Sequence, residues 1–130
     1  MKRVALILAL VATAPAFAGG EEGVWKTLPD KDGKSLLIEI KPCGKEVCGF
    51  IIGSQDEKGR PDPHYPHLGR RMIWGMVDNG DGSYDKGYIW GPAVDMTLSM
   101  KMRLKGDVLR VKGCFAGGLI CKGQDWTRVR

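Results

Sequence analysis

The sequence predicts an all-β domain, an antiparallel meander of about eight strands that is closed as a barrel or packed as a sandwich. Apolar and polar residues alternate with a period of two in several stretches, most clearly in "MTLSMKMRL", residues 96–104. That period is typical of a half-buried strand. Turn-forming glycine, aspartate and asparagine separate these stretches, in "PDKDGK", "DNGDG", "KGD" and "AGG". Short strands at regular spacing with tight turns favour a meander.

The N-terminus has the layout of a secretory signal peptide. Lys2 and Arg3 precede an apolar run over residues 4–12, and Ala16-Phe17-Ala18 supplies small residues at a cleavage site. A retained membrane anchor is the alternative, but the run is shorter than the roughly 20 residues that span a bilayer. We expect residues 1–18 to be removed and residues 19–130 to form a single domain, with no membrane span after cleavage.

The charge balance argues against a nucleic-acid partner. Removing Lys2 and Arg3 lowers the formal net charge from +5 to +3, and the remaining lysines and arginines are scattered. Nucleic-acid-binding domains concentrate positive charge more strongly. We therefore expect no nucleic-acid partner. The signal peptide indicates an exported protein, periplasmic or secreted.

The strands follow one another along the whole mature chain. No segment shows a convincing helical period. One long connection, residues 53–69, contains three prolines and is predicted to be irregular; connections of this length are disproportionately functional. The expected strands are residues 24–27, 35–41, 47–52, 71–77, 83–90, 96–104, 108–113 and 124–129.

Four cysteines lie in the mature part of the chain, at Cys43, Cys48, Cys114 and Cys121. Export places them in an oxidising compartment, where disulfides persist. Four cysteines allow three pairings, and proximity favours pairing each cysteine with its nearer neighbour across a glycine-containing turn. A four-cysteine zinc site is the alternative, but its pairs are normally separated by two to four residues.

A series of motifs resembles a known family. The segments are "GVWKT", "IEIKPCGKEVCGFII", "LGRRMIWGM", "DNGDGSYDKGYIWGP" and "LRVKGCFAGGLICKGQDWTRV". In this order they are similar to the small exported bacterial proteins called DUF2147, over roughly Gly23 to Val129. The family has no known function. The resemblance implies a fold, a single antiparallel up-and-down β-barrel of the lipocalin (calycin) type.

The same resemblance implies how the barrel is closed at one end. Gly23 and Trp25 match the G-x-W that opens the first lipocalin strand, and Arg128 lies where a last-strand arginine stacks on that tryptophan. We expect Gly23, Trp25, Trp126 and Arg128 to have a structural role. A guanidinium over an indole contributes about 0.5 to 2 kcal/mol.

An eight-stranded barrel can be filled by its own side chains or can hold one small molecule. We expect a binding protein for an apolar or amphipathic ligand, because methionine adapts to irregular guests. Arg71, at the predicted mouth, is a candidate for an anionic group of the ligand. A structural or protein-binding module of the cell envelope, with a filled core and exposed Tyr65 and Tyr88, is the alternative. The expected interior side chains are Met72, Trp74, Met76, Trp90, Met96, Leu98, Met100 and Met102.

A third hypothesis is copper or zinc handling. His64, His67, Met72 and Met76 lie within thirteen residues and supply soft and borderline ligands, although their spacing fits no single coordination geometry. We predict neither a cofactor nor a resident metal. Ser83 and Ser99 are candidate nucleophiles, but nothing in the sequence places a base beside either, so we do not expect an enzyme.

Overall fold

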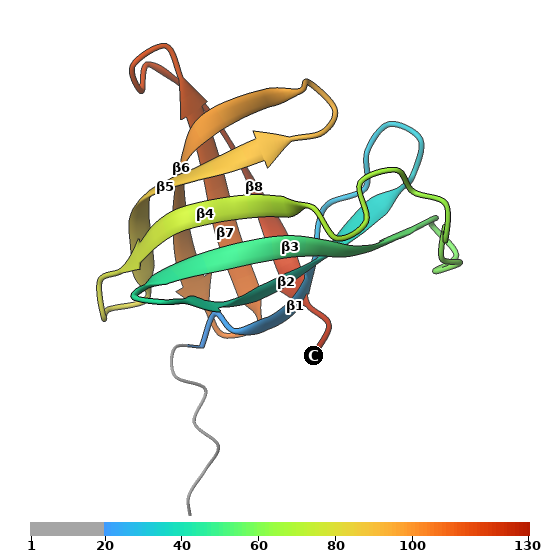
Figure 1. Cartoon of the computed structure of the whole chain (residues 1–130), viewed down its shortest axis with the longest axis horizontal. Helices are drawn as coiled ribbons and strands as arrows, with labels where there is room; N and C mark the ends of the chain where they lie inside the picture. The colour runs from blue at the N-terminus through green and yellow to red at the C-terminus, as the bar shows by residue number, and fades with distance from the viewer. Residues whose placement is uncertain (1–19) are drawn as a thin grey trace, which may run out of the picture.

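The computed structural model describes residues 20–130, and every regular element in that range is a β-strand (Figure 1). The predicted signal peptide, residues 1–18, lies outside the described residues. No helix in residues 20–130 is long and apolar enough to cross a bilayer. The strands are β1 (Gly23–Lys26), β2 (Ser35–Cys43), β3 (Glu46–Gln55), β4 (Arg71–Asp78), β5 (Ser83–Gly91), β6 (Met96–Lys105), β7 (Val108–Phe115) and β8 (Ile120–Arg128).

The eight strands form one closed antiparallel barrel in the order of the sequence, with β8 pairing back to β1. This confirms the predicted up-and-down barrel. Closure leaves no free strand edge, which removes the aggregation hazard of an open sheet. The largest difference from the sequence prediction is at β8, which begins at Ile120 rather than at Gln124, because residues 120–123 pair with β7 across a short turn.

The barrel has two unlike ends. Short turns between β2 and β3, β4 and β5, and β6 and β7 lie at one end, together with the C-terminus; we call this the closed end. Gly20 also lies there, beside Leu104 and Arg128. The connections at residues 27–34, 56–70, 92–95 and 116–119 lie at the other end, which we call the open end (Figure 1).

The closed half of the barrel is filled with apolar side chains. Trp25, Ile38, Met76 and Leu109 are each fully buried there. Packing of this kind excludes water and supplies the main favourable contribution to folding. The filled-core alternative therefore describes this half of the barrel.

Register shifts between β3 and β4 decide which side chains of β4 face inward. The β3–β4 register shifts twice, around Gly49, while β4 and β5 stay in register with Ile73 opposite Ile89 and Trp74 opposite Tyr88. A bulge of this kind moves the following side chains to the other face of the sheet. Ile73 is fully buried, whereas Tyr88 is 47% exposed and stacks on Trp74. Trp74 is partly buried and packs against the core, but its ring stacks on Tyr88 rather than sharing the interior face with Met72 and Met76 as predicted.

Candidate functional site

A cavity of about 510 Å³ lies at the open end of the barrel. Side chains from β2 to β8 form its walls, and the connections at residues 27–34, 56–70 and 92–95 form its rim. Pockets for small molecules in proteins have volumes of about 300 to 1,000 Å³. The barrel is thus filled at one end and hollow at the other.

The deep part of the cavity is mainly apolar. Met72, Val111 and Trp126 are almost completely buried, and Leu36 and Leu98 are partly buried beside them. Gln124 holds the indole of Trp126, because its amide oxygen accepts a hydrogen bond from Trp126 Nε1 at 2.7 Å. The same oxygen also accepts from the Leu28 backbone N–H at 3.2 Å, so the amide ties β8 to the β1–β2 connection.

The rim carries the polar and charged groups of the cavity. Lys34 and Lys122 line it, and within residues 20–130 neither ammonium group has an ion-pair partner. Asp30 also lines the cavity, but its Oδ1 accepts hydrogen bonds from the backbone N–H groups of Lys34 and Asp32, in that way stabilising its own turn. The Lys34 backbone hydrogen bond lowers the pKa of the Asp30 carboxyl group. The rim therefore offers two free cations to a ligand.

The long connection closes one side of the mouth through aromatic contacts. The ring of His67 meets the ring of Trp90 edge-on at 4.9 Å and that of Tyr65 at 5.5 Å. Arg70 lies over Trp90, with its guanidinium carbon 3.3 Å from the ring centroid. The Trp90 N–H donates to Asp95 Oδ1 at 2.9 Å. These contacts fasten residues 65–70 to the β5–β6 hairpin.

Only two of the predicted interior side chains, Met72 and Leu98, line the cavity. Three of the other predicted interior side chains are buried in the filled half of the barrel: Met76, Met100 and Met102. Met96, at the start of β6, is 44% exposed because it extends beyond the barrel wall. Trp90 is buried, but against the long connection rather than the cavity.

The predicted role of Arg71 at the mouth is also corrected. Arg71 is exposed and does not line the cavity; its guanidinium carbon lies 5.1 Å from the ring centroid of Trp74. Sequence reasoning missed the rim lysines and the connection residues because nothing local marks them. They come together only when the strands close into a barrel and three separate connections meet at its open end. The polar and large apolar cavity residues that local sequence patterns do not identify are Thr27, Leu28, Asp30, Lys34, Leu36, Ser54, Ile89, Val111, Lys122 and Gln124. Tyr65 and His67, candidates for protein binding and for metal handling, also line the cavity.

The histidines and methionines of residues 64–76 are dispersed. His64 is exposed, Met76 is fully buried in the closed half, and only His67 and Met72 line the cavity. Among residues 20–130, no group of three or more His, Cys, Asp or Glu side chains is placed to hold a metal ion.

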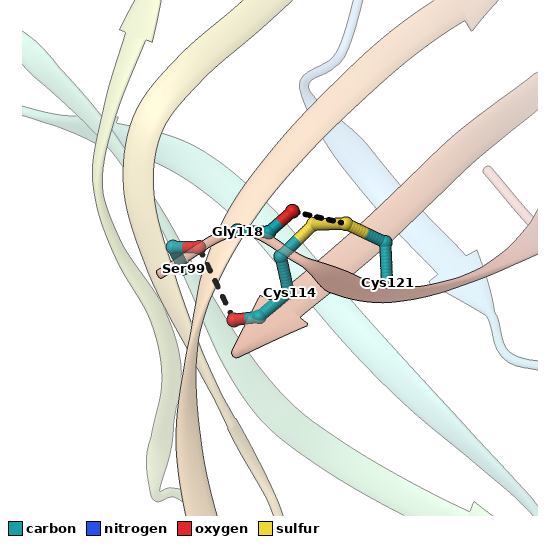
Figure 2. The surroundings of a disulfide bond; sticks show 4 residues. All are labelled: Ser99, Cys114, Gly118 and Cys121. Carbon is teal, nitrogen blue, oxygen red and sulfur yellow. Dashed lines mark hydrogen bonds between the residues drawn. A yellow bond between two sulfur atoms is a disulfide. The ribbon is translucent and has the colours of Figure 1, made fainter. Parts of the chain in front are cut away.

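The candidate nucleophiles are engaged in local hydrogen bonds. The Ser99 hydroxyl donates to the Cys114 carbonyl oxygen at 3.1 Å, as Figure 2 shows. The Ser83 hydroxyl donates to Asp81 Oδ1. Both serines therefore serve the sheet and its turns.

The closed end contains the predicted arginine–tryptophan contact. The guanidinium carbon of Arg128 lies 4.3 Å from the ring centroid of Trp25, and Arg128 also donates to the backbone carbonyl oxygens of Glu22 and Gly20. Gly23 has a φ of 133°, and a Cβ there would collide with the Arg130 carbonyl oxygen. Trp126 differs from expectation, because it lies at the cavity rather than at the closed end.

Two disulfide bonds join neighbouring strands. The structure pairs Cys43 with Cys48 and Cys114 with Cys121, the pairing that proximity favours. Cys114 and Cys121 lie directly opposite each other on β7 and β8, and their bond is close to Ser99 on β6 (Figure 2). No cysteine is left free in the described residues. Disulfides are typical of proteins exported to an oxidising compartment.

Comparisons with known proteins agree with this architecture. Residues 23–128 match the family described as "Uncharacterized protein conserved in bacteria (DUF2147)". The chain belongs to the DUF2147 family. Among curated proteins, none matches this DUF2147 chain.

A solved structure shares the fold. It is that of protein HP1028 from Helicobacter pylori, described as belonging to the lipocalin family, with a TM-score of 0.65 and 17% sequence identity. The alignment covers 84% of the DUF2147 chain and 82% of the Helicobacter protein. At this identity the likeness shows a lipocalin-type barrel and says nothing of ligand or activity.

Proposed function

We propose that this protein is an exported, periplasmic binding protein that holds one small amphipathic ligand in the cavity at the open end. The observation that carries the proposal is the unequal filling of the barrel, with a solid closed half beneath a cavity of about 510 Å³. A solid core throughout would suffice for folding alone. A cavity with a mainly apolar interior and a few polar groups at its entrance is the usual form of a small-molecule site.

The lining argues for a ligand with an apolar body and an anionic group. Met72, Val111 and Trp126 offer an apolar, adaptable surface. Lys34 and Lys122 offer two unpaired cations at the rim, whereas Asp30 already accepts hydrogen bonds from its own turn. An apolar ligand tail would thus lie deep and its anionic head would meet the lysines.

The test uses two fluorescent probes that share a phenylnaphthylamine framework and differ in a single sulfonate group. Anilinonaphthalene sulfonate carries a sulfonate, and phenylnaphthylamine is neutral. We expect the mature protein to bind both, with a preference for the sulfonate that falls in the Lys34→Ala and Lys122→Ala variants. Exposed charge contacts contribute about 0.2 to 1 kcal/mol, so each substitution should weaken sulfonate binding by up to about fivefold.

A blocking variant distinguishes the cavity from the outer surface. Leu98 lines the cavity and is partly exposed, so Leu98→Lys should place an ammonium group in the apolar interior and abolish binding of the neutral probe, which gains nothing from the added charge. Thr97→Lys adds the same charge at the exposed neighbouring position and serves as the control. Met100 is unsuitable for this purpose because it is buried in the filled half. Equal binding of phenylnaphthylamine by the Leu98→Lys and Thr97→Lys variants would refute the proposal.

A further inference from the structure

The β7–β8 hairpin presents apolar side chains to solvent at the open end. Figure 1 shows its turn projecting from the barrel. Leu119 is 86% exposed, and Phe115 and Ile120, which pair with each other at the hairpin end, are 41% and 47% exposed. A cluster of large apolar side chains on a projecting turn costs free energy in water. Such clusters mark interaction sites on soluble proteins.

Lysine side chains lie on both faces of the sheet next to this turn. Lys101 and Lys112 lie directly opposite each other on β6 and β7, and Lys122 on β8 is opposite Gly113, the residue after Lys112. All three lysines are exposed, and no ion pair to any of them exists within residues 20–130. Like charges directly opposite each other destabilise a sheet. Folding alone therefore does not account for this arrangement.

Basic residues predominate in the sequence around this turn. Residues 96–124 contain six lysines and arginines and one acidic residue, Asp107. Asp107 lies at the closed end, where it accepts a hydrogen bond from Arg128 Nε at 2.9 Å. Asp125, the next acidic residue along the chain, pairs with Arg110. Neither carboxylate pairs with the three lysines below the hairpin turn.

We propose that the β7–β8 hairpin docks the protein on the surface of an anionic phospholipid bilayer. Phe115, Leu119 and Ile120 enter the headgroup region, while Lys101, Lys112 and Lys122 meet the lipid phosphates. Apolar insertion combined with basic residues is how peripheral proteins bind anionic membranes. A protein partner fits less well, because three side chains on a narrow turn provide far less than the roughly 1,000 Å² of a specific protein interface.

Docking in this way would bring the cavity to the membrane. Lys122 and Gly123 of β8 also line the cavity, so the same hairpin joins the two sites. The inference goes beyond ligand binding and does not depend on it, because vesicle binding is measured without a cavity ligand.

The test is cosedimentation of the mature, disulfide-bonded protein with vesicles. One vesicle preparation contains phosphatidylglycerol and phosphatidylcholine, and the other contains phosphatidylcholine alone. We expect binding to the anionic vesicles that weakens as salt is added. Lys112→Gln should weaken binding about fivefold, since each basic residue near an anionic surface contributes on the order of 1 kcal/mol. Leu119→Ser should weaken it at least about tenfold.

Matched variants at the closed end provide the controls. Val129→Ser changes an apolar residue that is 45% exposed, and Lys45→Gln removes an exposed lysine from the β2–β3 turn. Both should bind anionic vesicles as the unaltered protein does. Near-ultraviolet circular dichroism checks that each variant is folded.

Three outcomes would overturn the proposal. The first is the absence of binding to anionic vesicles at low salt. The second is equal weakening by Lys112→Gln and Lys45→Gln, which would indicate a net-charge effect. The third is unchanged binding by Leu119→Ser. None of the altered residues lines the cavity, so probe binding there should be unchanged in these variants, and failure here is distinguishable from failure of the proposed function.

Discussion

Arg128 lies over the indole ring of Trp25 and joins the last strand of the barrel to the first, with 4.3 Å between the guanidinium carbon and the ring centroid. The same guanidinium donates to the Glu22 carbonyl oxygen at 2.9 Å and to that of Gly20. One side chain thus fastens the N-terminal segment, β1 and β8 together. The β1–β8 pairing is short, with two registered residue pairs, so the barrel needs this additional tie.

Replacing Arg128 with alanine should lower the free energy of unfolding by about 2 to 4 kcal/mol. The change removes a cation–π contact and leaves two backbone carbonyl oxygens without their donors. Urea unfolding followed by tryptophan fluorescence measures the effect. Arg110→Ala is the matched control, because Arg110 is exposed and its one ion pair within residues 20–130 is with Asp125; surface pairs of this kind contribute at most about 1 kcal/mol. Equal effects of the two variants would contradict the role given to Arg128.

Glu21 should make stability depend on pH. Burial raises the pKa of the Glu21 carboxyl group above its ordinary value of 4.5, while Tyr84 donates a hydrogen bond to it at 2.9 Å. The folded protein therefore retains a proton that the unfolded chain loses. Because the folded state binds this proton more tightly than the unfolded chain, the free energy of unfolding decreases as the pH rises above 4.5.

The Glu21→Gln variant tests that sign. Glutamine keeps an acceptor for the Tyr84 hydroxyl and carries no charge. Only the unaltered protein loses stability through this group as the pH rises, so the Tm of the variant minus that of the unaltered protein should increase between pH 4 and pH 7. Glu22→Gln, at the neighbouring partly exposed position, is the control. A constant Tm difference over this pH range would show that Glu21 titrates normally in the folded protein.

Each disulfide bond should contribute about 2 kcal/mol to the free energy of unfolding. The bonds close short rings, with sequence separations of 5 and 7 residues, and the loop-entropy relation gives rings of this size about 2 to 2.5 kcal/mol. Chemical denaturation of the Cys43→Ser, Cys48→Ser double variant and of the Cys114→Ser, Cys121→Ser double variant measures each contribution. An effect below about 0.5 kcal/mol for both would contradict the ring-closure argument.

Arg70 should hold the long connection over the mouth of the cavity. Arg70→Ala removes the guanidinium that lies 3.3 Å from the Trp90 ring centroid. Cation–π contacts contribute about 0.5 to 2 kcal/mol, so the connection should open more often and exchange its amide hydrogens faster. Hydrogen exchange over residues 56–69 measures this. Arg71→Ala, whose side chain lies over Trp74 on another part of the surface, should leave that exchange unchanged.

Much of this architecture is readable from local patterns in the chain. The alternation in "MTLSMKMRL" identifies β6, and the glycine and aspartate turns separate the neighbouring strands, because strand formation and tight turns depend on residues close together in sequence. The proximity of Cys43 to Cys48, and of Cys114 to Cys121, favours the pairing that the structure contains. The closure of the barrel and the contact between Arg128 and Trp25 were predictable only from the resemblance to the family.

The cavity could not be located in the same way, because its walls are brought together only by barrel closure and by changes in strand register. Alternation along β4 suggests that Trp74 faces inward with Met72, but two register shifts against β3 turn its ring toward Tyr88 on the outside. Met76 and Met102 follow the predicted face, yet they fill the closed half. A period of two says which face a side chain is on; its depth along the barrel axis, and hence whether it meets a core or a cavity, depends on contacts between strands distant in sequence.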